Sequence, residues 1–360
     1  MQPLEALRDC KRPVLAFGAG VRGAEEKARA FAAALGIPVI VTWAARDMFP
    51  DAIGGFGTHG VRAANLAVQN CDWLLAIGAR LDTKATGTPV KLFAPLAKRW
   101  MVDVDPAEIE KFQHLDLEIE GICTTAEEFF SSQKDAVADF ELAQSIAAMP
   151  AGRMGVDAPD FGAWRWQCKD WKFENPPGAG REPYRIMIEL GRHLRPEDTV
   201  VSDTGCVLAW AMQALKLPCR FLHAWNQTPM GSGLPMAIGA AFATGKRVIL
   251  LTGDGGLAVN SIELADVAKH NLPIKILLFN NRGYAMCRQT QRQWLDGRYH
   301  GADAVDLATP NFGGIARANG IWCAPSMESA LSHDGPAFHE FEIGEDEEVS
   351  PQVKFGEALA

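Results

Sequence analysis

The stretch that most constrains this chain runs from Val248 to Gln291. It opens with an apolar run, Val248 to Leu251, which leads into Gly253-Asp254-Gly255, and a second apolar run, Ile274 to Phe279, ends at Asn280-Asn281. Buried parallel strands have continuous apolar sequences, and their carboxyl ends meet at the sheet edge where α/β proteins bind ligands. A carboxylate and a carboxamide offer hard oxygens for Mg²⁺, and glycine backbone offers N–H groups for a phosphate. The stretch therefore predicts two neighbouring buried strands that carry a cation and phosphate site.

The spacing within the stretch makes this signal specific. Asn281 follows Asp254 by 27 residues, which is one βα turn further along the sheet. A Gly-Asp-Gly triplet alone is a weak signal, because it is also a common turn. The helix after Asp254 is expected to begin at Asn260, with Glu263 three residues later as its capping-box partner.

Composition excludes several classes of protein. The 360 residues are 48% apolar and 22% charged, which suits two globular domains of ordinary size. The net charge of −9 argues against nucleic acid as a partner, because phosphate neutralisation needs clustered Lys and Arg. No run of about 18 apolar residues predicts a membrane span, and the N-terminus has no apolar signal core, so we expect a cytoplasmic protein. The eight cysteines form no C-x-x-C pair and are expected to be reduced thiols.

Short apolar runs alternate with helical patterns in both halves of the chain. In the first half the expected strands are 13–17, 38–42, 73–77 and 100–104, with a helix at 25–35. From Pro183 a helix at 183–194 is followed by further strands at 199–202, 219–223 and 337–343. This rhythm predicts an α/β fold class with two doubly wound parallel-sheet domains. The expected boundaries are a first domain at 1–135, a linker at 136–180, a second domain at 181–345 and a solvated acidic tail at 346–360.

Two other patterns are interpreted as structural. The segment Gly18 to Gly23 reads G-x-G-x-x-G after a strand, but a dinucleotide site also requires an acidic residue at the end of the next strand. That position is Thr42-Trp43, which favours a tight glycine turn. Trp164, Trp166 and Trp171 are expected to pack a short helix against a neighbour.

Several segments together resemble the thiamine-diphosphate-dependent enzymes of the acetolactate (acetohydroxyacid) synthase-like family. The second half resembles the diphosphate-binding domain of that family in the opening stretch and in NQTPMGSGLPMAIGAA, residues 226–241. The first half resembles its Rossmann-like middle domain in FGTHG at 56–60, GARLDTKATG at 78–87 and VDVDPAEI at 102–109. His59 lies in the first of these motifs, in a turn that approaches the active site in the family.

The resemblance implies a role for each matching residue. The metal ligands would be Asp254, Asn281 and the carbonyl of Gly283. Met230 would support the bent cofactor, and Met286 would face its thiazolium ring. Cys287 and Thr290 would face the substrate. The implied diphosphate-binding residues are Gly205, Cys206, Val207, Gly255 and Gly256.

The implied function is a thiamine-diphosphate- and Mg²⁺-dependent reaction on a 2-oxo acid such as pyruvate, by decarboxylation and carboligation. GARLDTKATG departs from the family segment that contacts flavin, so FAD binding is doubtful. Thr290 stands where the family has a tryptophan that selects the second 2-oxo acid, which leaves the acceptor open. The expected binding partners are therefore small-molecule 2-oxo acids, and neither nucleic acid nor a membrane is expected.

The resemblance begins at the middle domain, so the pyrimidine-binding domain and its catalytic glutamate are expected to be missing from this chain. The catalytic residue is therefore unknown. The expected assembly is a homo-oligomer or a hetero-oligomer with a pyrimidine-domain subunit that acts in trans. Three alternatives stay open: a truncated or non-catalytic cofactor-binding module, another 2-oxo acid decarboxylase or lyase of the superfamily, and a nicotinamide oxidoreductase that uses the Gly18 turn.

Overall fold

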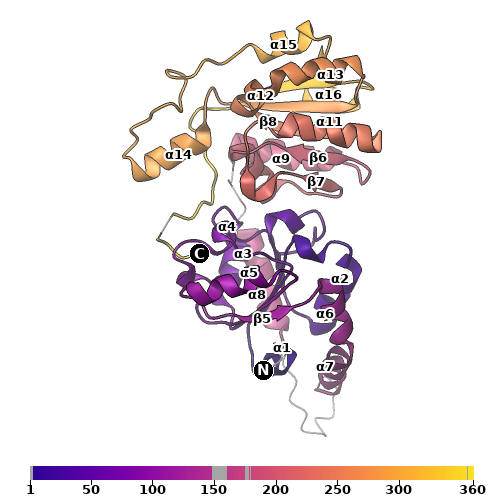
Figure 1. Cartoon of the computed structure of the whole chain (residues 1–360), viewed down its shortest axis with the longest axis vertical. Helices are drawn as coiled ribbons and strands as arrows, with labels where there is room; N and C mark the ends of the chain where they lie inside the picture. The colour runs from indigo at the N-terminus through magenta and orange to yellow at the C-terminus, as the bar shows by residue number, and fades with distance from the viewer. Residues whose placement is uncertain (1–2, 148–159, 175–177, 179, 355) are drawn as a thin grey trace. The chain divides into compact units, whose positions relative to one another are not determined.

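The computed structural model describes residues 3–147, 160–174, 178, 180–354 and 356–360. These residues form two compact units (Figure 1). Unit 1 comprises Met1–Pro177 together with Pro351–Ala360, and unit 2 comprises Gly178–Ser350.

Among its described residues, unit 1 contains one parallel sheet with the strand order β2-β1-β3-β4-β5. The strands are β1 (Pro13–Phe17), β2 (Val39–Val41), β3 (Trp73–Ile77), β4 (Lys98–Asp103) and β5 (Glu120–Cys123). The helices are α1 (Pro3–Leu7), α2 (Glu25–Leu35), α3 (Arg62–Asn70), α4 (Thr83–Thr86), α5 (Pro106–Glu110), α6 (Ala126–Ser132), α7 (Lys134–Ala147) and α8 (Gly162–Glu174). The predicted strands are thus present, with ends displaced by up to two residues.

Helices cover both faces of this sheet because successive strand residues point to opposite sides. Leu15 and Phe17 of β1 belong to the core that α2 and α6 complete, whereas Val14 and Ala16 belong to the core that α3 and α8 complete. Apolar residues at every position of β1 and β3 therefore fit a sheet buried on both faces.

The Gly18 turn is required by backbone packing. A Cβ on Gly18 would lie 2.1 Å from the carbonyl oxygen of Gly78, and one on Gly20 would lie 2.7 Å from the Gly78 Cα. Gly20 also donates its N–H to the Gly78 carbonyl at 2.9 Å. These contacts give the glycines a structural role, as the sequence interpretation favoured.

The tryptophans of α8 also have a packing role. Trp164 is buried, donates Nε1–H to the Pro13 carbonyl at 2.9 Å and lies edge-on to Trp171 at 5.6 Å between ring centroids. Trp166 is exposed, and Lys169 lies over its ring.

The end of the chain does not form the solvated tail that its acidic sequence predicts. Leu359 is 3% exposed and belongs to the α3–α8 core of unit 1. Val353 donates its N–H to the Thr58 carbonyl at 2.8 Å, and Gly356 donates to the Thr88 carbonyl at 2.7 Å. Apolar residues spaced through the acidic sequence, rather than its charge, decide where this segment lies. We refer to Pro351–Ala360 as the terminal segment.

Unit 2 also contains one parallel sheet among its described residues, with the order β10-β11-β9-β8-β6-β7. The strands are β6 (Thr199–Ser202), β7 (Arg220–Leu222), β8 (Val248–Gly253), β9 (Ile274–Asn280), β10 (Trp322–Cys323) and β11 (Ala337–Glu342). The helices are α9 (Glu182–His193), α10 (Cys206–Ala214), α11 (Gly233–Thr244), α12 (Asp254–Asn260), α13 (Leu264–Lys269), α14 (Ala285–Trp294), α15 (Phe312–Ala318) and α16 (Met327–Ser332). The two parallel sheets with their helices confirm the predicted α/β fold class.

The opening stretch forms the centre of this sheet. Its strands β8 and β9 are adjacent, with Leu250 paired to Ile276 and Gly253 paired to Phe279. One prediction about the stretch is wrong: the helix begins at Asp254, not at Asn260, where it ends. Ser261–Glu263 then forms a 3-10 turn without a side-chain cap, so the expected capping box is also absent.

The eight cysteines are free, as expected for reduced thiols. In the described part of the chain, no helix is both long enough and apolar enough to cross a membrane.

Candidate functional site

Three neighbouring strands of unit 2 bring polar residues to one edge of the sheet. β8 lies between β6 and β9, with Ser202 paired to Leu251 and Gly253 paired to Phe279. Asp203 follows β6, Asp254 follows β8 and Asn281 follows β9. The parallel arrangement therefore places two carboxylates and a carboxamide at adjacent strand ends.

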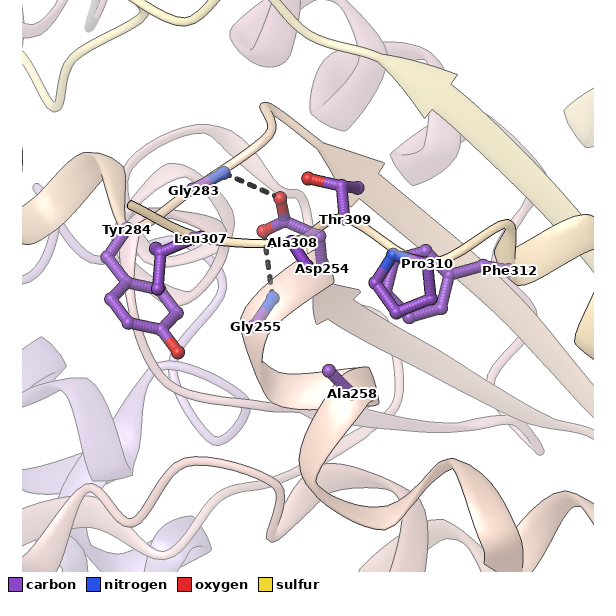
Figure 2. A pocket seen from close by; sticks show the side chains of 10 residues that line it. All are labelled: Asp254, Gly255, Ala258, Gly283, Tyr284, Leu307, Ala308, Thr309, Pro310 and Phe312. Atoms are coloured by element: carbon purple, nitrogen blue, oxygen red, sulfur yellow. Dashed lines mark hydrogen bonds between the residues drawn. The ribbon is translucent and has the colours of Figure 1, made fainter. Parts of the chain in front are cut away.

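Asp254 is buried, at 6% exposure, and both of its carboxylate oxygens accept backbone N–H groups. Oδ1 accepts from Gly255 and Oδ2 accepts from Gly283, each at 2.8 Å (Figure 2). Burial raises the pKa of Asp254, and the two N–H groups and the Arg288 guanidinium oppose that rise. The carboxylate is thus fixed in direction and linked to the turn that follows β9.

That turn contains the other two predicted metal ligands. The Asn281 side chain is buried and makes no hydrogen bond to another described residue. The backbone carbonyl of Asn281 accepts from Arg288 Nη2 at 3.3 Å, and Arg288 Nη1 donates to the Ala302 carbonyl at 3.0 Å. Arg288 therefore holds the backbone of the turn through the Asn281 carbonyl, while the Asn281 carboxamide keeps its hydrogen-bonding capacity.

A small pocket of about 50 Å³ lies beside Asp254. Its wall is formed partly by the start of α12 and partly by the segment before α15, which contributes Leu307 and Thr309 among the side chains drawn in Figure 2. The lining residues are Asp254, Gly255, Ala258, Gly283, Tyr284, Leu307, Ala308, Thr309, Pro310 and Phe312. The structure thus places Asp254, Gly255 and Gly283 together at one cavity.

Gly255 and Gly256 at this edge are packed so closely that a side chain would not fit without displacing a neighbour. A Cβ on Gly255 would lie 2.4 Å from the Tyr284 ring and 3.0 Å from Cε of Met230. Met230 is nevertheless 43% exposed, so its thioether lies on the surface of this edge rather than in the core. Gly205 precedes α10 with φ +100°, a conformation that favours glycine.

The remaining predicted residues lie on helices that start at the same edge. Cys206 and Val207 are buried in the first turn of α10, so only their backbone could meet a ligand. On α14, Met286 and Thr290 are half-buried, and Cys287 is exposed. Thr290 donates its hydroxyl to the Met286 carbonyl at 2.9 Å. None of these α14 residues lines the pocket beside Asp254.

Sequence reasoning missed Asp203. This residue is 1% exposed, and burial raises the pKa of its carboxyl group, opposed by hydrogen bonds from backbone N–H groups. The available signal was its place directly after a strand and two residues before Gly205, which is the same arrangement that drew attention to Asp254.

His59 of unit 1 is held in a structural network. Its Nδ1 lies 3.1 Å from the Thr58 hydroxyl, and its Nε2 lies 3.0 Å from Nε2 of Gln352 in the terminal segment. Burial, with a smaller contribution from Lys84, lowers the pKa of His59 to about 4. These contacts account for His59 without a ligand.

The residues at the unit 2 edge fit a magnesium ion and a diphosphate. A fixed carboxylate and a carboxamide with no hydrogen bond to another described residue offer the oxygen ligands that Mg²⁺ prefers, and the pocket has room for a small cation. Gly255 and Gly256 lie in the first turn of α12, and the N-terminal turn of a helix favours an anion such as a diphosphate. The described residues contain no cluster of three His, Cys, Asp or Glu side chains that could hold a different metal.

Two family models match the chain. Residues 203–341 match the C-terminal TPP binding domain of thiamine pyrophosphate enzymes, and residues 2–128 match their central domain. The first match contains the whole edge described above. The second covers the sheet of unit 1.

Curated relatives agree with these matches. The acetolactate synthase large subunit of Corynebacterium glutamicum is 31% identical over 384 residues, which cover 99% of this chain and 58% of the relative. The acetolactate synthase isozyme 2 large subunit of Escherichia coli is 31% identical over 377 residues, which cover 99% of this chain and 64% of the relative. A probable acetolactate synthase large subunit of Methanocaldococcus jannaschii is 32% identical over 339 residues, which cover 88% of this chain and 53% of the relative.

This chain therefore spans less than two thirds of the length of these relatives. The matches to the Corynebacterium glutamicum and Escherichia coli subunits nevertheless cover 99% of this chain. Both the family models and the relatives agree with the motifs in its sequence. The chain belongs to the thiamine pyrophosphate enzyme family, in the acetolactate synthase-like branch.

Proposed function

We propose that this chain supplies the central and diphosphate-binding domains of a thiamine-diphosphate- and Mg²⁺-dependent enzyme that acts on a 2-oxo acid such as pyruvate. The observation that carries the proposal is the joint placement of Asp254, Asn281 and Gly283 at two adjacent strand ends. This arrangement lies inside the region that matches the TPP binding domain.

Each residue of the edge has a defined task in this proposal. Asp254, the Asn281 carboxamide and the Gly283 carbonyl hold the metal. The backbone of Gly255 and Gly256, with that of residues 205–207, binds the diphosphate. Met230 supports the cofactor from its exposed position, and Met286, Cys287 and Thr290 of α14 face the reacting end. When bound, thiamine diphosphate supplies the electron sink for decarboxylation of the 2-oxo acid.

The reaction is proposed to be a decarboxylation followed by carboligation, as the relatives named acetolactate synthase suggest. We propose that a pyrimidine-binding domain, with the glutamate that activates the cofactor, is supplied in trans. The active protein would then be a homo-oligomer or hetero-oligomer in the cytoplasm. A non-catalytic cofactor-binding module is the second candidate, because the two family models that match the chain describe a central domain and a TPP binding domain.

Calorimetric titration tests the proposal. Thiamine diphosphate with Mg²⁺ should bind the wild-type chain, alone or with a pyrimidine-domain protein, and chelation of Mg²⁺ should abolish that binding. Asp254→Asn should weaken binding at least about tenfold, because it removes the charge that holds the cation. Asp266→Asn is the matched control: it removes the same charge from an exposed position on α13 and should leave affinity unchanged.

Absence of binding under every condition would overturn the proposal, and equal affinity of the wild-type and Asp254→Asn chains would overturn the metal assignment. Release of CO₂ from pyruvate separates the two candidates. Binding without CO₂ release, even with the pyrimidine-domain protein, would favour the non-catalytic module.

A further inference from the structure

Asp203 is a buried carboxylate that joins three segments of unit 2. Its Oδ1 accepts N–H groups from Thr204 at 2.7 Å and from Gly231 at 3.0 Å, and its Oδ2 accepts from Gly233 at 3.0 Å. Thr204 belongs to the turn before α10, whereas Gly231 and Gly233 belong to the turn that starts α11. A single side chain thus fixes backbone that is 28 and 30 residues away in sequence.

The third segment is the start of α12. A Cβ on Gly256 would lie 2.8 Å from Cγ of Asp203, and one on Gly233 would lie 3.0 Å from its Oδ2. The distance at Gly256 is shorter than real Cβ atoms show, and the distance at Gly233 is tighter than most of their contacts, so the glycines permit the close approach. Asp203 therefore lies against each segment that contains predicted diphosphate-binding or cofactor-supporting residues.

Both backbone polar groups of Gly231 are hydrogen-bonded. Its N–H is donated to Asp203, and its carbonyl accepts from Asn260 Nδ2 at 2.6 Å. Met230 directly precedes this peptide and is itself partly exposed. The position of Met230 is therefore determined by the backbone that follows it, rather than by burial of its own side chain.

We propose that Asp203 is a positioning residue for cofactor binding. It fixes the first turns of α10, α11 and α12 relative to one another and thereby places Met230 against the diphosphate edge. This inference rests on the proposed function and adds to it a residue that does not itself touch the metal. An aspartate suits the task because a carboxylate accepts several N–H groups at once.

A purely structural role is the alternative, and Asp198 provides the control. Asp198 lies at the opposite end of β6, is also buried, and is bonded to the Arg195 N–H and to the Arg247 guanidinium. Asp203→Asn and Asp198→Asn therefore make the same isosteric change at the two ends of one strand, one at the cofactor edge and one away from it. Both are expected to lower the melting temperature of unit 2.

Only Asp203→Asn is expected to weaken thiamine diphosphate–Mg²⁺ binding, by about tenfold or more, because its amide nitrogen cannot accept an N–H. It should also accelerate amide hydrogen exchange at Gly231 and Gly233 by at least about tenfold relative to Asp198→Asn. Asn260→Asp, which removes the second restraint on Gly231 from a half-buried position, is expected to weaken cofactor binding in the same direction. This variant keeps the test available if Asp203→Asn does not fold.

Equal cofactor affinities for the two aspartate variants would overturn the proposal, as would equal exchange at Gly231 and Gly233. If Asp203→Asn does not fold, wild-type affinity in Asn260→Asp overturns it instead. Failure of the wild-type chain to bind cofactor would instead count against the proposed function. The exchange comparison needs no cofactor and would still decide whether Asp203 orders the α11 start.

Discussion

Two buried carboxylates at neighbouring strand ends differ in how many of their lone pairs are used. Burial raises the pKa of both Asp203 and Asp254. Asp203 accepts three backbone N–H groups, whereas Asp254 accepts two, and an ionised carboxylate offers about four acceptor sites. Asp254 therefore keeps more capacity for a cation, and Asp203 is more fully committed to the fold.

Met230 is expected to affect ligand binding without affecting stability. Met230→Ala should weaken thiamine diphosphate binding by about tenfold, since the lost apolar contact is worth roughly 1–2 kcal/mol. The free energy of unfolding should change by less than about 0.5 kcal/mol, because Met230 is 43% exposed and lies outside the core. Calorimetry and thermal unfolding measure the two effects. Ile262→Ala truncates an exposed apolar side chain in the 3-10 turn after α12 and should change neither quantity. A loss of stability in Met230→Ala would contradict a surface role for Met230.

The His59 ring should make unit 1 less stable in acid. Its pKa in the folded chain is lowered to about 4 from an ordinary value of 6.5, so between these values the unfolded chain binds a proton that the folded chain does not. The resulting stability is present above pH 6.5 and is lost as the pH falls toward 4.

His59→Gln should flatten this part of the pH dependence when denaturant midpoints of unit 1 are compared from pH 4 to 7. His114→Gln, at an exposed position, should keep the wild-type slope. The same slope in all three proteins would show that His59 does not titrate as described.

At the scale of elements, α12 shows how tertiary contacts override local propensity. Glycines at positions 255 and 256 disfavour helix, and the sequence predicted a later start at Asn260 from its capping-box spacing with Glu263. The helix begins at Asp254 because a carboxylate is favourable in a first turn, and because Tyr284, Met230 and Asp203 leave no room for any residue but glycine. The asparagine predicted to cap the helix instead binds the Gly231 carbonyl.

Two glycine substitutions in neighbouring helices should have opposite effects. Gly256→Ala should lower the free energy of unfolding by roughly 1–3 kcal/mol and weaken cofactor binding, because its Cβ would collide with Asp203. Gly239→Ala on α11 should raise the free energy of unfolding by about 0.5–1 kcal/mol, since no atom lies within 4 Å of its added Cβ. Denaturant unfolding compares the two, and a stabilised Gly256→Ala variant would contradict the packing described at Asp203.

The strands were predictable for a simple physical reason. A strand buried on both faces is mostly apolar, so β1, β3, β8 and β9 are visible in the sequence, although β9 also buries Lys275. Asp254 and Asn281 could be placed at strand ends in advance because each follows such a strand, whereas the role predicted for Gly283 came from the resemblance to the family. The hydrogen bonds of Asp203 could not, since its partners Gly231 and Gly233 are distant in sequence and the bonds involve backbone N–H groups, which every sequence position carries.

For the whole molecule, the main long-range feature is that the terminal segment belongs to unit 1 and packs into its core. Leu359→Ala should lower the free energy of unfolding of unit 1 by about 2 kcal/mol or more, because a buried leucine is truncated next to Gly87. Leu96→Ala removes an exposed leucine of the same unit and should cost less than about 0.5 kcal/mol. Unfolding followed by hydrogen exchange resolves unit 1 from unit 2. Equal effects of the two substitutions would mean that the terminal segment adds nothing to unit 1.

Net charge misled the prediction for this segment. An acidic composition indicates a solvated tail, but composition does not record that Val353, Gly356 and Leu359 each meet a specific partner in unit 1. Such partners are distant in sequence, as the contact of Gln352 with His59 illustrates, with a separation of 293 residues.

Because unit 1 contains chain from both sides of unit 2, unit 2 is an inserted domain in topological terms. An exchange of unit 2 with that of a relative therefore needs two junctions, near 177–178 and 350–351, rather than one. A single proteolytic cut at the first junction would leave a C-terminal fragment that still carries ten residues of unit 1. Those residues would act as a non-covalent tether, so the two fragments should co-purify until unit 1 is denatured.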